Sequence, residues 1–336
     1  MKPGTAATRP WGPAPWLMRH LKRDWSLLGC LGPEERSLGM LEFLHDRKEL
    51  RDAQLLEVLP VQTSRFYALA SARLNERRAQ LATSGLNVPI SPMALFSSDQ
   101  DIVEAADSFI ASSSAHVILD ISALPKRFFF PLVRRLLRPN RLETVVVTYS
   151  VPETYGRGDL AEDHQPFTHL PLFGPSSFPQ RRPEIVIVSA GFMKLGLGEL
   201  LEPYKTVSIR TIVPFPPGPP SYFRNLDFVR DIEKALPQGI PDPIRVEAYD
   251  CVDAFDHIAQ LCDQGRRPCI LAPYGPKPIS LAMALYASLS QDVVLYTQPT
   301  AYDPFYSTGI KKLDGLIEAH AYVLRSRGTN LYKLGT

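Results

Sequence analysis

The heptapeptide Ala115–Ile121, AHVILDI, decides the fold class of this chain. A short and uninterrupted apolar run is typical of a strand that is buried on both faces, as the strands of parallel sheets are. Helical spacing precedes it at Asp99–Ile110 and follows it at Phe128–Leu137, and a second apolar run, LETVVVTY, comes at Leu142–Tyr149. Strands that alternate with helices in this way predict an α/β fold, with a parallel sheet covered by helices on both faces.

The same alternation extends over both halves of the chain. In the first half, strands are expected at Trp25–Gly32, Leu55–Val61, Val88–Phe96, Ala115–Ile121 and Leu142–Tyr149. In the second half, they are expected at Glu184–Phe192, Thr206–Pro214, Ile244–Tyr249, Pro268–Pro273 and Asp292–Gln298. The other expected helices are Ser37–Leu44, Ser64–Leu81, Leu195–Tyr204, Tyr222–Leu236, Asp253–Cys262 and Ile279–Leu289.

Two turns recur at almost the same offset in the two halves. After the fourth strand of each half comes a Pro-Lys turn, at Lys126 and at Lys277, and the offset is 277 − 126 = 151. After the fifth strand comes a Pro-x-x-Tyr turn, at Tyr155 and at Tyr302, and the offset is 302 − 155 = 147. The recurrence predicts an internal duplication that gives two tandem Rossmann-like lobes, each a doubly wound parallel sheet. The alternative is that all α/β chains look alike at this level of detail.

Composition divides the chain into five segments. Residues 1–20, which contain many Pro and Gly residues, are expected to form a flexible arm, and residues 21–156 to form the first lobe. Residues 157–183 are charged and rich in Pro, which predicts a linker. The second lobe is expected at 184–310, with a stiff proline-rich loop at Pro214–Pro220, and a C-terminal tail at 311–336 with a helix at Leu313–Leu324.

The overall composition excludes several classes of protein. The 336 residues are 45% hydrophobic and 21% charged, which excludes a wholly disordered or collagen-like chain. The net charge of +2 gives no strong field toward nucleic acid or membrane. No apolar run approaches the roughly 18 residues of a membrane span, and the first residues lack the apolar core of a secretory signal. We therefore expect a cytoplasmic protein that does not bind membranes.

Cysteine and histidine spacing gives no sign of a metal site. The four cysteines show no zinc spacing, and we expect them to be reduced and partly buried. The seven histidines are scattered, and the common cofactor and hydrolase motifs are missing from the sequence. The sequence therefore predicts no metal and no cofactor.

Polar residues cluster after the expected strands, where ligands bind in doubly wound sheets. Lys126 and Lys277 are the sharpest signal, because a Lys at a strand-to-helix turn lies beside helix N–H groups that attract phosphate. The alternative is a solvated Lys at the start of a helix. If the two lobes face each other about a pseudo-twofold axis, both rims form one composite cleft.

The other candidate residues each have a structural alternative. Arg36 is expected to bind an anion, although the Glu-Glu-Arg run at the start of a helix can simply complement the helix dipole. Asp120 could contact a ribose hydroxyl or cap the next turn. Tyr155 and Tyr302 could stack on a base or anchor their own loops. The expected ligand-binding residues are Arg36, Ser122, Lys126, Arg127, Tyr155, Gly275, Lys277, Ser280 and Tyr302.

The stretch Pro273–Ala282, PYGPKPISLA, resembles the strand-to-helix signature of CARF domains, the CRISPR-associated Rossmann fold. Gly275, Lys277 and Pro278 keep the Gly-x-Lys-Pro core of that signature, whereas Pro276 replaces its Thr. The turn at Asp120–Lys126 looks like a more divergent copy. The resemblance implies a covalent pseudo-dimer that binds cyclic oligoadenylate or a related nucleotide across the twofold axis.

The Glu35-Arg36-Ser37 element and the Pro-x-x-Tyr turns are also similar to those of prokaryotic proteins from defence gene clusters. The main hypothesis is therefore a cytoplasmic sensor of a nucleotide or phosphorylated small molecule that acts through a partner protein, in anti-phage defence. The first alternative is a nucleotide hydrolase or transferase with Glu35 or Asp120 as general base. The second alternative is a structural subunit of a larger complex. The basic residues of the helix at 126–141 are expected to form a solvated face, with weak nucleic-acid contact as the alternative, so nucleic acid is not an expected partner.

Overall fold

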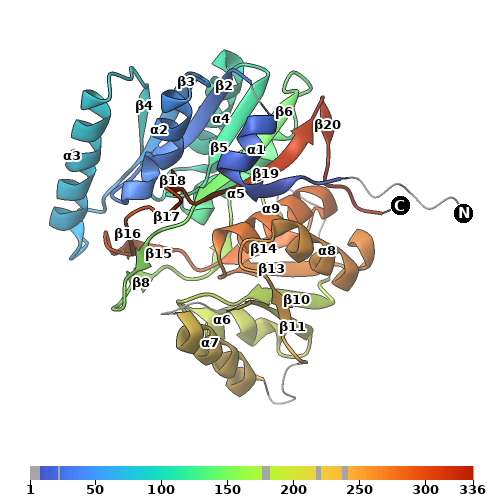
Figure 1. The fold of residues 1–336 in the computed structure, drawn as a ribbon. Helices are drawn as coiled ribbons and strands as arrows, with labels where there is room; N and C mark the ends of the chain where they lie inside the picture. Colours follow the sequence, from blue (N-terminus) through green and yellow to red (C-terminus); the bar gives the residue numbers. More distant parts are fainter. Residues whose placement is uncertain (1–7, 22, 176–181, 217–220, 237–240, 336) are drawn as a thin grey trace, which may run out of the picture.

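A computed structural model describes residues 8–21, 23–175, 182–216, 221–236 and 241–335, and it shows an α/β protein with two parallel-strand sheets (Figure 1). We call each sheet, with the helices packed on it, a lobe. The blue and green part of the chain forms most of the first lobe, and the yellow and orange part forms most of the second (Figure 1). The expected α/β class is confirmed.

The first sheet holds five parallel strands from the first half of the chain. These are β2 (Trp25–Leu31), β3 (Leu50–Leu59), β4 (Ile90–Ala94), β5 (His116–Asp120) and β6 (Thr144–Ser150). Their order in space is β4-β3-β2-β5-β6, which is 3-2-1-4-5 when the strands are counted along the chain. This order reverses between β2 and β5, so the crossover helices lie on both faces of the sheet.

The second sheet repeats that order with strands from the second half. These are β10 (Ile185–Ser189), β11 (Ser208–Pro214), β12 (Ile244–Val246), β13 (Cys269–Pro273) and β14 (Val293–Tyr296). Their order in space is β12-β11-β10-β13-β14, again 3-2-1-4-5 along the chain. The switch in strand order lies between β10 and β13.

The helices lie between these strands, as the sequence predicts. They are α2 (Gly39–Asp46), α3 (Tyr67–Thr83), α4 (Asp99–Ser112), α5 (Lys126–Leu136), α6 (Leu197–Leu201), α7 (Ser221–Ala235), α8 (Cys251–Leu261) and α9 (Lys277–Ser290). Helix α4 begins with a capping box, in which the Ser98 hydroxyl accepts from the N–H of Asp101 and the Asp101 carboxylate accepts from the N–H of Ser98. Helices α5 and α9 both follow a proline, Pro125 or Pro276, with almost the same backbone angles.

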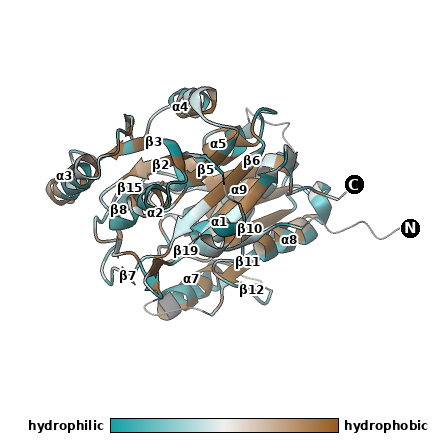
Figure 2. Ribbon diagram, turned by 45° about the horizontal axis from the view of Figure 1, so that its top comes forward, coloured by the Kyte–Doolittle hydropathy of each residue, from teal (hydrophilic) through white to brown (hydrophobic). Residues whose placement is uncertain are grey.

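The two lobes share one apolar core, because α5 packs against α9. The side chains of Phe128, Phe129 and Phe130 on α5 are fully buried, and so is most of α9. Figure 2 shows the brown, hydrophobic residues gathered on the sheets and on α5 and α9 in the middle of the molecule. A second apolar cluster covers the other face of the first sheet, beneath α1 (Ala14–His20) and α2. The lobe interface is thus part of the protein interior.

Each sheet is extended by a strand that follows the other lobe in sequence. After the first lobe, β9 (Thr168–His169) crosses over and pairs antiparallel with β14 of the second sheet. After the second lobe, β19 (Ala319–Ser326) crosses back and pairs antiparallel with β6 of the first sheet. In both sheets the added strand lies beside the fifth parallel strand, so the exchange is reciprocal.

Two short ladders repeat this exchange beside the sheets. Strand β7 (Thr154–Tyr155) pairs with β16 (Ser307–Thr308), and β15 (Pro299–Tyr302) pairs with β8 (Ala161–His164). Each ladder joins the segment after one lobe to the segment after the other. The residues between the lobes, expected to be a linker, therefore carry strands that pair with the second half of the chain.

Two expectations about the chain ends are wrong. The expected helix at Leu313–Leu324 is absent, and this segment holds β17 (Lys312–Leu313), β18 (Leu316–Ile317) and most of β19. The edge of β6 offers backbone hydrogen bonds to this segment, and pairing with it overrides the local helical spacing.

The N-terminal arm is also ordered in the described part. Residues Trp11–Pro13 form β1, which pairs with β19, and α1 follows directly. The Trp11 ring stacks on Tyr322 at a centroid distance of 6.1 Å, which holds this strand on the first sheet. Residues 1–7 of the expected arm, and 217–220 of the proline-rich loop, lie outside the described residues.

In the described residues, no helix is both long enough and apolar enough to span a membrane. All four cysteines are buried and unbridged.

Candidate functional site

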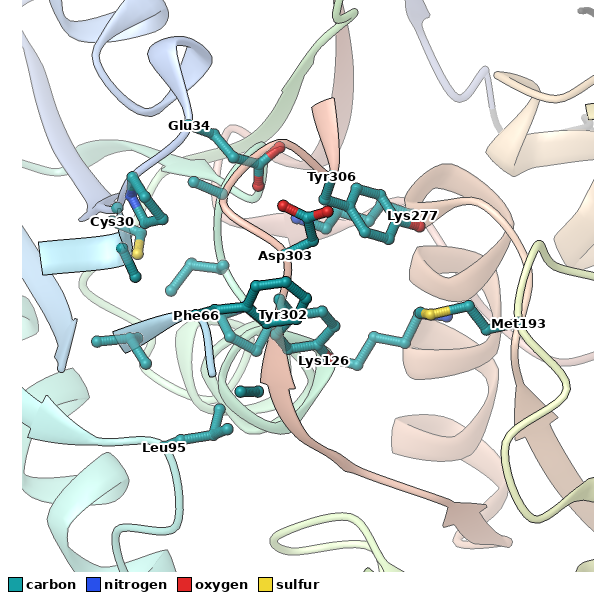
Figure 3. Close-up of a pocket in the computed structure, with 18 of the residues that line it drawn as sticks. Cys30, Glu34, Phe66, Leu95, Lys126, Met193, Lys277, Tyr302, Asp303 and Tyr306 are labelled. Carbon is teal, nitrogen blue, oxygen red and sulfur yellow. The ribbon is translucent and has the colours of Figure 1, made fainter. Parts of the chain in front are cut away.

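A pocket of about 210 Å³ lies between the lobes, at the carboxyl ends of their strands (Figure 3). Residues that follow β2 and β5 line it from the first lobe, and residues that follow β10 and β13 line it from the second. These are the positions at which strand order reverses in each sheet, where doubly wound folds bind ligands. The two switch points therefore open into one shared pocket.

Lys126 and Lys277 reach across the pocket to the opposite lobe. The Lys126 ammonium donates to the carbonyls of Pro273 and Gly275, the latter at 2.9 Å. The Lys277 ammonium donates to the carbonyls of Ile121 at 2.9 Å and Ser122 at 2.6 Å. The contacts from Lys126 to Pro273 and from Lys277 to Ser122 are equivalent, because 273 − 122 = 151 and 277 − 126 = 151. Each lysine thus ties the start of its own helix to the end of a strand in the other lobe.

Burial makes both lysine amino groups costly to protonate. Burial, and the nearby charge of Lys277, hold the pKa of Lys126 well below its ordinary value. Burial and the nearby charge of Arg36 together lower the pKa of Lys277 to about 7, while Glu34 acts in the opposite direction. Neither ammonium forms an ion pair with a carboxylate among the described residues, so the pair has no direct counter-charge.

Arg36 is the third cation of the pocket, and it has a carboxylate partner. Its guanidinium donates to Glu34 at 2.9 Å and lies over the Tyr149 ring, 5.3 Å from the centroid. The hydroxyl of Ser307, from the end of the second half, also donates to Glu34. The pKa of Arg36 is raised by Glu34 against the opposing effect of burial, so the guanidinium stays charged. This cluster fixes one wall of the pocket.

Tyrosines from both halves form much of the remaining wall. Tyr155 lies within hydrogen-bonding distance of Tyr149, with the two hydroxyls 2.9 Å apart. Tyr302 accepts a hydrogen bond from the Gln298 amide at 3.1 Å. Burial raises the pKa of both Tyr155 and Tyr302, so both phenols are neutral at ordinary pH. Both expected tyrosines therefore line the pocket, and both are also anchored by their neighbours.

The structure brings most of the expected ligand-binding residues to this pocket. Six of them line it, and they are Arg36, Lys126, Tyr155, Gly275, Lys277 and Tyr302. Position 275 requires a glycine, because the Cβ of any other residue would lie only 2.9 Å from the Ser189 side chain.

Three expected ligand-binding residues lie outside the lining. Ser122 donates to Asp120, Arg127 donates to the carbonyl of Ser97, and Ser280 donates to the carbonyl of Gly275. These contacts are within the protein, and each serves to hold a turn or a strand end.

Neither candidate general base is among the residues that line the pocket. Asp120 is buried behind the turn, where its carboxylate accepts from the hydroxyls of Ser122 at 2.5 Å and Thr148 at 3.2 Å. Burial raises the pKa of Asp120 to about 6, against the effect of these hydrogen bonds. Glu35 accepts from the backbone N–H of Gly309 and lies 3.5 Å from Arg73. In this geometry both carboxylates stabilise turns.

Sequence reasoning missed several residues of the pocket. Figure 3 shows Phe66, Leu95 and Met193 among the side chains that surround the cavity. Tyr296 was also missed, and its ring lies 5.2 Å from the Lys126 ammonium. A signal for Tyr296 existed, because it lies 147 residues after Tyr149, the offset of the Pro-x-x-Tyr turns. Phe66, Leu95 and Met193 carry no such signal, since only the folded chain brings them to the cavity.

In the described residues, no three His, Cys, Asp or Glu side chains come together as a metal site requires. Compared with known proteins, the chain matches no family model, and no curated protein matches it. The chemistry of the pocket therefore has to be inferred from its own geometry.

Proposed function

We propose that the interlobe pocket binds a nucleotide or another phosphorylated small molecule, and that the protein is a sensor of this ligand. The observation that carries the proposal is the pair of lysine amino groups, on buried Lys126 and half-buried Lys277, which line the pocket without a carboxylate partner among the described residues. A bound phosphate would favour the protonated form of both lysines, whose pKa values burial lowers. Each resulting ammonium has three N–H donors, and the backbone carbonyls take two on each lysine. A phosphate that accepts the third donor of each would supply the missing negative charge.

We also propose that the lobes are Rossmann-like and arose by internal duplication. Both sheets have the 3-2-1-4-5 order, and both receive an antiparallel strand beside the fifth. The equivalent lysine contacts obey one offset of 151 residues. These relations support a covalent pseudo-dimer with one shared site, as the resemblance to CARF domains implies.

The output of the sensor is proposed to pass through a partner protein, in anti-phage defence. The shared core and the exchanged strands oppose a large change of the angle between the lobes. Tyr155 and Tyr302 line the pocket and end strands β7 and β15 of the two short ladders, so these ladders are better placed to respond to a ligand. A partner that contacts these ladders would detect the bound state.

The test is a titration of purified protein with inorganic phosphate and with adenosine monophosphate, followed by calorimetry at a temperature well below unfolding. The perturbed protein carries Lys126→Gln and Lys277→Gln together. The control is Lys234→Gln, because the Lys234 side chain is 78% exposed and lies away from the pocket.

We expect the double variant to bind at least about 100-fold more weakly than the native protein, since each charge-assisted hydrogen bond contributes roughly 1.5–3 kcal/mol. The control should bind as the native protein does. Equal binding by the double variant, or no binding of either compound by the native protein, would overturn the proposal.

A further inference from the structure

The described residues that line the pocket differ between the lobes, although the strand order of the lobes is the same. The first lobe lines it with residues that follow all five of its parallel strands. In the described part of the second lobe, only the residues that follow β10, β13 and β14 line it. The additional lining of the first lobe comes after β3 and β4, and it is mostly apolar.

We call this additional lining the apolar arm, and it consists of Leu59, Val61, Phe66, Tyr67 and Leu95. Leu59 is 40% exposed and Tyr67 is 39% exposed, so the arm leaves apolar surface in contact with water. Figure 3 labels Phe66, Tyr302 and Lys126 in the middle of the view and Leu95 below them, and all four line the pocket. The apolar arm and the cationic residues therefore line one pocket.

The arm offers few polar partners to a ligand. The side-chain polar groups there are the Ser64 hydroxyl, which accepts from the backbone N–H of Phe66 at 2.9 Å, and the phenol of Tyr67. A sugar or another polyol placed there would lose hydrogen bonds to water without replacing them. A flat apolar group would instead bury surface against Phe66 and Leu59, which is favourable.

We infer that the pocket selects phosphate monoesters that carry a flat apolar group, with the phosphate at Lys126 and Lys277 and the flat group in the apolar arm. This inference rests on the proposed phosphate binding. It places the flat group against the first lobe, whose apolar arm follows β3 and β4. A nucleotide satisfies it through its base, and so does a simple aryl phosphate.

The experiment compares phenyl phosphate, methyl phosphate and inorganic phosphate by calorimetric titration of the full chain. We expect phenyl phosphate to bind on the order of tenfold more tightly than methyl phosphate, because the ring buries apolar surface in the arm. Leu59→Asp places a carboxylate in the arm and should remove this preference. Leu69→Asp is the matched control, because Leu69 is 39% exposed on α3 and does not line the pocket.

The outcomes separate the two proposals. If the three compounds bind equally well, phosphate binding stands and the inference about the arm is overturned. If phenyl phosphate is preferred but Leu59→Asp and Leu69→Asp behave alike, the ring lies elsewhere and the inference is also overturned. If the native protein binds none of the three, the proposed function fails, and the inference fails with it.

Discussion

Replacing Lys277 by methionine should change how the stability of the protein depends on pH. The folded-state pKa of Lys277 is about 7, because burial and the charge of Arg36 disfavour its ammonium form. In the unfolded chain a lysine titrates near ~10.4. Between these two values the unfolded chain binds a proton that the folded chain does not, so stability rises with pH. Methionine has a similar length and no proton to bind, which removes this contribution.

The magnitude follows from the pH interval. One proton corresponds to about 1.4 kcal/mol per pH unit, so the interval from pH 7 to about 8.5 gives up to roughly 2 kcal/mol. The Lys277 side chain is only partly buried, and screening by water reduces this figure, so we expect about 1–2 kcal/mol. The native protein should gain this amount relative to Lys277→Met as the pH rises, and the difference should level off below pH 7. The loss of two hydrogen bonds adds an offset that does not vary with pH.

The assay is urea unfolding of both proteins at several pH values between 6 and 8.5, with Lys234→Met as an exposed control. Other groups titrate in this range, and taking the difference between native protein and variant cancels the contributions of those that do not interact with Lys277. The pKa of Lys126 does depend on Lys277, so its contribution is part of the measured difference. The control should give a difference that is constant with pH. The reasoning is refuted if the native protein and Lys277→Met have parallel profiles, because Lys277 would then keep its charge when buried.

Three further predictions follow from buried groups and from the exchanged strands. Burial raises the pKa of Asp120 to about 6, so between pH 4 and 6 the carboxyl is charged in the unfolded chain but protonated in the folded protein, and stability falls as the pH rises. In urea unfolding, Asp120→Asn should remove this loss of about 2–3 kcal/mol in the free energy of unfolding. An unchanged dependence of stability on pH in the variant would contradict this prediction. A Cβ at Gly191 would lie 2.0 Å from the carbonyl oxygen of Tyr274, so Gly191→Ala should lower stability by about 1–3 kcal/mol or more. Gly198→Ala is the control, because a Cβ there would meet no atom within 4 Å, and it should be neutral or slightly stabilising. Thermal melting of both variants checks this prediction. Each sheet takes its outer strand from the other part of the chain, so fragments 1–175 and 182–336 should each lack cooperative unfolding alone and regain it when mixed. Circular dichroism would follow the unfolding. A cooperative transition in either fragment by itself would show that the lobes fold independently.

The sequence alone was sufficient to predict the parallel strands and the helices between them. The runs at 116–120 and 144–150 lie in strands whose two faces are both covered, and their apolar residues therefore follow one another without the alternation of a half-exposed strand. Ser98 and Asp101 form the cap of α4 from residues that are neighbours in sequence. Local patterns of this kind can be detected without knowledge of the tertiary structure.

The parts that could not be predicted depend on distant partners. The segment at 319–326 has apolar residues that suit a helix or a strand, and the open edge of β6, about 170 residues earlier in the chain, decides for the strand. In the site, the Pro-Lys turns indicated Lys126 and Lys277 as important residues. Their carbonyl partners could not be predicted, because they belong to the opposite lobe and depend on how the lobes are arranged.

The exchanged strands also have a consequence for synthesis of the protein on the ribosome. Chains emerge from the N-terminus, and domains generally fold as they emerge. Strand β6 needs β19 to cover its edge, and β19 begins 169 residues after β6 ends, since 319 − 150 = 169. An uncovered strand edge invites pairing with other chains. During synthesis the edge of β6 therefore stays open while the whole second lobe is being made, and the first sheet is complete only after β19 has emerged.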